Sequence, residues 1–285
     1  MIDIHTHPVQ VADLYDGDPN LTRAVRDVFG FYVKPQPLDT FLYQLDEAGI
    51  DQAVLLPIDC TTTHGCKIVS NEQIVELVEK SDRFIGFASV DPLQPNAPKD
   101  LEKAIKSYGL RGLKLDPSLQ GFSLHHDEYV YPIFQVCEEL DIPVLLHCGM
   151  SWSPIGRAEL AQPIHLERII HRFPNVRMII AQFGWPWVAE SLMLALKHQN
   201  VYLDTSILFS GTPPESFRHV VEKVIGLETF DRSLHQQVVF GSSYPRVDPK
   251  RVVGAIKEMG FRESLEKKIF HDNAARLLKL EGQSL

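Results

Sequence analysis

The chain has 285 residues, of which 44% are hydrophobic and 23% charged, proportions close to those of average globular proteins. Its formal net charge of −9, with no basic cluster, argues against a nucleic acid or an anionic membrane surface as partner and leaves a small-molecule substrate open. The first residues lack the basic region of a signal peptide, and no apolar run approaches the ~20 residues that span a bilayer, so we expect a cytoplasmic protein.

Short apolar runs separated by segments of helical spacing predict a regular alternation of strands and helices. The predicted strands are 1–5, 53–58, 84–90, 112–116, 144–147, 177–182, 201–205 and 238–242. The predicted helices are 38–48, 72–80, 98–108, 130–140, 166–172, 186–198, 214–225, 252–259 and 263–280. Between the first strand and the first helix lies a long connection, 8–37, of a length that is usually functional or mobile.

Eight apolar strands that alternate with helices predict a parallel sheet covered by helices and closed into a (β/α)8 TIM barrel. A doubly wound open sheet is the alternative, but no glycine-rich phosphate loop follows the first strand. No linker or low-complexity tract divides the chain, so we expect one domain over residues 1–285.

In such a barrel the active site lies at the C-terminal ends of the strands. His5 and His7 lie two residues apart at the first tip, so both side chains should point to the same side. His147 ends the fifth strand and should lie across the barrel mouth from them. Three imidazoles are good ligands for zinc or a similar divalent ion. The alternatives are polar residues that cap the barrel, or a chance pair among 12 histidines.

A set of motifs resembles the amidohydrolase superfamily, in particular the branch of aminocarboxymuconate semialdehyde decarboxylase and related benzoate decarboxylases, hydratases and lactonases. The matching segments are IHTHP (4–8), GLKLDP (112–117), PVLLHCG (143–149), AQFGWP (181–186), VYLDTS (201–206), FGSSYP (240–245) and NAARLL (273–278). The resemblance implies a TIM barrel that hydrolyses or decarboxylates a small carboxylated or cyclic compound. It also implies one divalent metal ion, with zinc as the first choice, held by His5, His7 and His147, and it leaves room for a homodimer.

Two motifs depart from the family pattern. Gln182 stands where the strand-six motif usually has a histidine, and Ser243 where the strand-eight motif usually has an aspartate that binds metal and handles a proton. Serine cannot take that proton at neutral pH without a neighbouring base, and glutamine is a weak, neutral ligand. We therefore expect a metal held by imidazoles alone to be bound weakly or to be absent.

Three explanations of these departures remain open. The enzyme could use another base, with Asp116, Asp204 or His125 as candidates near the strand tips. It could be a metal-independent lactonase that polarises a carbonyl with histidines and cations. It could also be a catalytically impaired barrel that serves as a binding protein.

Further residues on the catalytic face are candidates for binding the substrate. Lys114 could hold a substrate carboxylate, or it could be neutralised by Asp116 or Asp91. Aromatic and cationic side chains of the 8–37 connection suit either a lid or a dimer contact. The remaining candidates are Trp152, Arg157, Trp185 as the preferred pocket wall, and His64 in the loop between Cys60 and Cys66.

Overall fold

The computed structural model describes residues 1–16, 18–207 and 209–280, and within them each predicted strand is present. The barrel strands are β1 (Ile2–Thr6), β2 (Gln52–Leu55), β5 (Phe84–Gly86), β6 (Ala88–Ser89), β7 (Leu113–Leu115), β8 (Val144–Leu146), β9 (Met178–Ile180), β10 (Val201–Asp204) and β11 (Val238–Val239). They pair in parallel as β1-β2-β5 and as β11-β10-β9-β8-β7-β6. The predicted strand 84–90 is interrupted at Phe87, which divides it into β5 and β6.

Backbone contacts between the first and last strands close the ring. The amide of Ile4 donates to the carbonyl oxygen of Phe240 at 3.0 Å, and Thr6 forms a parallel bridge with Tyr244. This closure confirms the predicted (β/α)8 barrel.

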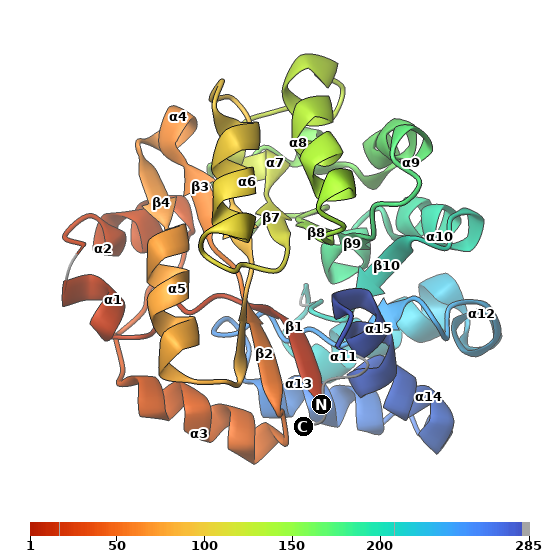
Figure 1. Ribbon diagram of the computed structural model, residues 1–285. Coiled ribbons are helices and arrows are strands. Elements are labelled where there is room, and N and C mark those ends of the chain that lie inside the picture. The colour runs from red at the N-terminus through yellow and green to blue at the C-terminus, as the bar shows by residue number, and fades with distance from the viewer. Residues whose placement is uncertain (17, 208, 281–285) are drawn as a thin grey trace.

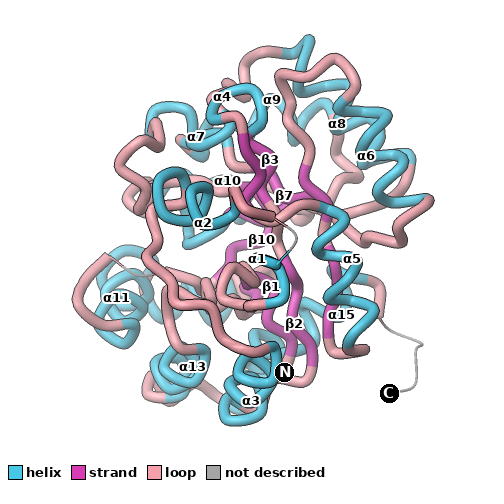
Figure 2. Tube along the Cα trace, turned by 90° about the vertical axis from the view of Figure 1, so that its left-hand side faces the viewer, coloured by secondary structure: helices cyan, strands magenta, loops and turns pink. Residues whose placement is uncertain are grey.

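Helices surround the strands (Figure 1), and a view turned by 90° shows the strands running through the interior (Figure 2). The α-helices that lie between or after the barrel strands are α3 (Leu38–Ala48), α5 (Asn71–Lys80), α6 (Ala97–Lys106), α7 (Pro117–Gln120), α8 (Asp127–Glu139), α9 (Glu167–Arg172), α10 (Val188–Lys197), α11 (Pro213–Arg218), α12 (Leu227–Ser233), α13 (Pro249–Lys257), α14 (Glu263–Lys267) and α15 (Asn273–Leu278). The shorter 3-10 and π segments are η2 (Ala158–Ala161), η3 (Pro163–Leu166), η4 (Ala181–Gly184), η5 (His219–Ile225) and η6 (Lys268–Asp272). In the described part of the chain, no helix is both long and apolar enough to cross a membrane.

Side chains of alternating parity divide the core into two layers. Ile4, Val54, Leu145, Ile179 and Val239 belong to an inner cluster that fills the barrel, and residues of α15 join this cluster. Their strand neighbours, among them the residues on either side of Leu145, pack outward against the helices. Strand residues whose side chains point inward, as those of this inner cluster do, are the ones that reach the barrel mouth.

The 8–37 connection is folded rather than loose. It contains α1 (Asp13–Asp16), α2 (Leu21–Arg23) and the π segment η1 (Ala24–Val28), and it buries Leu14, Leu21 and Val25. The segment that carries both Cys60 and Cys66 forms an antiparallel hairpin, β3 (Ile58–Cys60) and β4 (Cys66–Ile68), with α4 (Thr61–His64) at its tip. Both cysteines are free and buried.

Candidate active site

A local irregularity in β1 turns His5 toward the barrel interior. Asp3 pairs with Ala53 but Thr6 pairs with Leu55, so β1 has one residue more than β2 between these pairs. An extra residue of this kind re-aims the side chains that follow it. Ile4 already points inward, so without the shift His5 would point outward.

The carboxylate of Asp3 stabilises this irregularity by accepting hydrogen bonds from the backbone. Its Oδ1 accepts hydrogen bonds from the amides of His5 and Ser242, both at 3.0 Å. Complete burial raises the pKa of Asp3 to about 7 in spite of these bonds. The carboxyl group thus fixes the backbone on both sides of the barrel's closing seam.

Each imidazole of the first strand has one nitrogen committed to a protein acceptor. Nδ1 of His5 lies 2.8 Å from a carboxylate oxygen of Asp204, and Nδ1 of His7 lies 2.9 Å from the carbonyl oxygen of Leu56. Both partners accept, so Nδ1 carries the proton in each ring and the Nε2 lone pair is free. Asp204 therefore positions His5.

Burial disfavours the charged form of all three histidines. It lowers the pKa of His5 against the opposing pull of Asp204, and it lowers the pKa of His7 well below the ordinary value. For His147 burial brings the pKa down to about 4. Asp204 stays ionised because its contacts with His5, Ser206 and the Gln182 amide outweigh the burial that opposes ionisation, and they hold its pKa below the ordinary value. At neutral pH the three rings are therefore neutral donors of lone pairs.

The three imidazoles line one small cavity at the barrel mouth. About 20 Å³ is open to the centre of a water molecule, which is room for one water or one ion. The lining residues are His5, His7, Phe29, Lys114, Asp116, Leu119, His147, Ser151, Trp152, Gln182, Ser243 and Arg246. A wider cleft of about 350 Å³, lined partly by Asp59 and Asp91, contains none of these histidines.

Two cations share the cavity with the imidazoles. Burial lowers the pKa of Lys114, and within the described ranges no carboxylate oxygen lies within 4.0 Å of its ammonium group. Arg246 is half-buried, and its pKa, which burial lowers to about 10, keeps the guanidinium charged at neutral pH. Asp116 is the carboxylate that lines the same space, and its Oδ1 accepts the amide of Leu119 at 3.0 Å.

The two residues that depart from the family pattern both have left-handed backbone. Gln182 has a φ of 57° and Ser243 a φ of 62°, a conformation that non-glycine residues rarely adopt. The amide of Gln182 donates to Asp204 at 2.7 Å, and that of Ser243 to the carbonyl oxygen of His5 at 2.9 Å. These bonds hold each strand tip in a tight turn, with both residues lining the cavity.

Close packing beneath His5 requires a glycine. A Cβ atom on Gly241 would lie 2.9 Å from the Cβ of His5 and 3.5 Å from that of Asp204. Any larger residue at 241 would therefore displace the pair that orients the first imidazole.

The 8–37 connection covers the mouth through Phe29. Its ring lies 4.9 Å from that of His7 in an edge-on contact, and the guanidinium of Arg246 lies 4.3 Å from its centre. Arg246 also donates to the carbonyl oxygen of Gly30 at 3.4 Å, and Ser153 donates to that of Val28 at 2.6 Å. This closed cover leaves too little room for an aromatic acid, so substrate entry requires Phe29 to move.

The donor set suits a divalent transition ion. His5 and His7 have free Nε2 atoms, and Nε2 of His147 is buried without a hydrogen-bond partner in the described part of the chain. Among the described residues, one group of three potential metal ligands has its ligand atoms within 4.8 Å of one another. That group lies in the outer helical layer and does not include His5, His7 or His147. The barrel imidazoles would therefore have to move closer together to share one ion.

Buried neutral histidines predict loss of stability in acid. The pKa of His147 falls from the ordinary 6.5 to about 4 in the fold, so the unfolded chain binds its proton first as the pH falls. The contribution of His147 to the free energy of unfolding is fully present above pH 6.5. It is lost as the pH falls toward 4, and the total loss is about 3 kcal/mol. Urea unfolding of metal-free protein at about pH 7.5 and about pH 4.5 measures this loss. The loss should be about 2–3 kcal/mol smaller in His147→Gln than in the unaltered protein, and equal losses would contradict the assignment.

The family model described as amidohydrolase matches residues 2–280. This chain belongs to the amidohydrolase family. The resemblance that the strand-tip motifs indicated is thereby confirmed. A 2-amino-3-carboxymuconate-6-semialdehyde decarboxylase of Dictyostelium discoideum is 22% identical, over 96% of this chain and 76% of that protein.

Solved structures share the fold. An uncharacterised TIM-barrel protein from Bordetella bronchiseptica has a TM-score of 0.74 and 22% identity, with 98% of each chain covered. A 5-carboxyvanillate decarboxylase mutant from Novosphingobium aromaticivorans, with bound manganese and 3-methoxy-4-hydroxy-5-nitrobenzoic acid, has a TM-score of 0.62 and 18% identity. That match covers 98% of this chain and 95% of the decarboxylase.

In this amidohydrolase most of the predicted site residues come together. The cavity is lined by all three candidate metal ligands and by Lys114, Asp116, Gln182, Ser243 and Trp152. Asp204, a predicted catalytic residue, lies behind His5 and does not line the cavity.

Three predicted substrate-binding residues lie elsewhere. Trp185 does not line the cavity but stacks on Phe209 with ring centres 4.5 Å apart. Arg157 is exposed and donates to Glu159 at 3.1 Å. His64 lies at the tip of the β3–β4 hairpin, outside the lining. Trp185 packs on an aromatic ring of the connection after β10, and Arg157 pairs with a carboxylate two residues along the chain.

Arg246 is the charged lining residue that the sequence analysis did not identify. It follows directly after the strand-eight motif, which ends at Pro245, whereas the last candidate predicted at that strand tip was Ser243. A cation directly after a strand-tip motif was the available signal.

Proposed function

We propose that this amidohydrolase is a metal-dependent carboxy-lyase that removes a carboxyl group from a small carboxylated aromatic compound. The observation that carries the proposal is the pair of cations, Lys114 and Arg246, that line the same cavity as three neutral imidazoles. A cation held out of water is costly unless an anion compensates it. Asp116 supplies one negative charge, and a substrate carboxylate would supply the other.

The metal would be held by His5, His7 and His147. An ion bound there would polarise a carboxylate or carbonyl oxygen and would lower the pKa of bound water. Neutral imidazoles suit zinc, and the Novosphingobium relative binds manganese, so both ions belong in the tests. With no carboxylate ligand in the set, we expect weaker binding than in a site that includes an aspartate.

The residues of this chain supply binding, exclusion of water and a proton. The guanidinium of Arg246 binds the substrate carboxylate with its planar fork of donors. Phe29 closes over the site and keeps water out. When the bond between the ring carbon and the carboxyl carbon breaks, its electron pair stays on the ring carbon, which takes a proton, and carbon dioxide leaves. Lys114, whose pKa burial lowers, is the proton donor in this proposal.

A specific observation also favours hydrolysis of a lactone or related cyclic compound as a second candidate. The Asp116 carboxylate lines the cavity and could take a proton from an attacking water, a role that Ser243 cannot fill.

A panel of substrates distinguishes the candidates. We expect purified protein supplied with zinc or manganese to release carbon dioxide from at least one carboxylated phenol, with one proton taken up for each product molecule. Lactone opening without release of carbon dioxide would replace the carboxy-lyase by the hydrolase. No turnover of either class with either metal would leave a binding protein and contradict both.

A further inference from the structure

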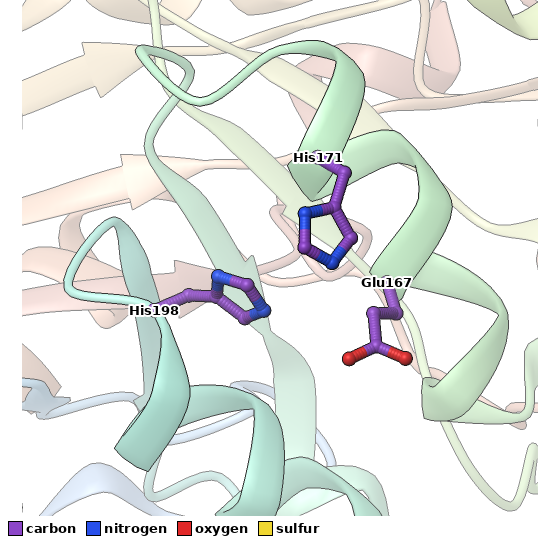
Figure 3. Close-up of side chains that lie close together, drawn as sticks. All are labelled: Glu167, His171 and His198. Atoms are coloured by element: carbon purple, nitrogen blue, oxygen red, sulfur yellow. The ribbon is translucent and has the colours of Figure 1, made fainter.

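A second group of metal-binding side chains lies in the outer helical layer. Glu167 and His171 are four residues apart on α9, and His198 follows directly after α10. One potential ligand atom from each side chain lies within 4.8 Å of the other two. Figure 3 shows the carboxylate and the two rings facing one another. Spacing of four residues places side chains on one helix face, which explains how α9 supplies two of the three.

The group lies at the end of the barrel opposite the mouth. α9 leads into β9, and His198 stands three residues before β10 begins. These are the N-terminal ends of the strands, whereas His5 and His147 stand at the C-terminal ends. The two groups are therefore separate, and neither can supply ligands to the other.

The cluster contains an unsatisfied buried nitrogen. Nε2 of His198 is shielded from solvent and has no hydrogen-bond partner among the described residues. Burial lowers the pKa of His198, with further lowering from His171 and Lys197. The ring of His171, 5.2 Å away, is exposed and able to rotate toward it.

We propose that Glu167, His171 and His198 form a second metal site, which binds zinc and joins α9 to α10. Two imidazoles and one carboxylate are a known zinc donor set, with water as the fourth ligand. Ligand atoms around tetrahedral zinc lie about 3.4 Å apart, so the side chains need only small rotations to close from their present separation. A site at this end of the barrel would serve stability rather than the reaction.

Lys197 competes with the metal for the carboxylate. Its ammonium group donates to Oε1 of Glu167 at 2.6 Å. This ammonium group competes with zinc for the carboxylate and repels the ion, so the Lys197→Met substitution should tighten zinc binding about two- to five-fold. Zinc bound to histidines elsewhere on the surface would not show this effect.

Equilibrium dialysis against zinc chloride at about pH 7.5, followed by metal analysis of the full chain, tests the proposal. His171→Ala, in which an exposed side chain is removed, should lose one zinc ion per chain, and His198→Ala should lose the same ion. His126→Ala removes an exposed histidine at the mouth end and should lose none. The ion should persist in His5→Gln/His7→Gln, which separates this site from the proposed active site.

Thermal unfolding gives a second readout. In the His5→Gln/His7→Gln background, zinc at about a hundred times its Kd should raise the midpoint temperature by roughly 4–8 °C, and adding His171→Ala to that background should remove most of the rise. Equal zinc content in His171→Ala and the unaltered chain would overturn the proposal. So would weaker zinc binding by Lys197→Met.

Discussion

Replacing Arg246 by methionine is expected to lower kcat/KM for a carboxylated substrate about 10–100-fold, since hydrogen bonds to a charged group contribute about 1.5–3 kcal/mol. Methionine retains much of the apolar stem of arginine and removes the guanidinium. Steady-state kinetics on the best substrate from the panel measures the effect. The loss should fall on kcat/KM because the fork of donors binds the carboxylate in the ground state and in the transition state.

Two further variants isolate the role of the guanidinium. Arg246→Lys keeps the charge without the planar fork and should recover only part of the activity. Arg157→Met removes an exposed arginine from the loop after β8 and should leave kcat/KM unchanged. Because Arg246 also holds the backbone of the 8–37 connection, binding of a neutral carboxamide analogue, which cannot be decarboxylated, serves as control. An equal loss of affinity for the carboxamide and for the carboxylate would show that Arg246 acts by fixing the cover rather than by binding the carboxylate.

Replacing His5 and His7 together by glutamine is expected to lower turnover roughly 10³-fold, because polarisation by a bound metal is worth several kcal/mol. Glutamine is close to histidine in size and can keep a hydrogen bond to Leu56 or Asp204, so the fold should survive. The rate of carbon dioxide release at saturating substrate measures the effect. His126→Gln is the matched histidine control. Retained turnover in the double variant would favour a metal-independent reaction.

The barrel and most of its mouth follow from local sequence patterns. The barrel strands are apolar on both faces until polar residues appear near their C-terminal ends, as in Leu145 followed by His147, and the parity of the strand carries that side chain inward. Such rules place Lys114 and His147 without knowledge of the tertiary structure.

The features that were not predicted depend on long-range contacts. The register shift that turns His5 inward depends on Asp3, whose partner Ser242 lies at the other end of the chain. The left-handed backbone at Gln182 and Ser243 leaves no signal in residue type, because neither is a glycine. Arg246 became a site residue only through the folding of a connection more than two hundred residues earlier over it.

The metal content of the His5→Gln/His7→Gln variant tests the central claim most directly. The measurement is made in a His171→Ala background, so that the outer cluster does not contribute, after dialysis against zinc or manganese. We predict about one ion per chain with the barrel histidines intact and close to none in the double variant. Equal metal content in the two proteins would show that these imidazoles do not hold the ion.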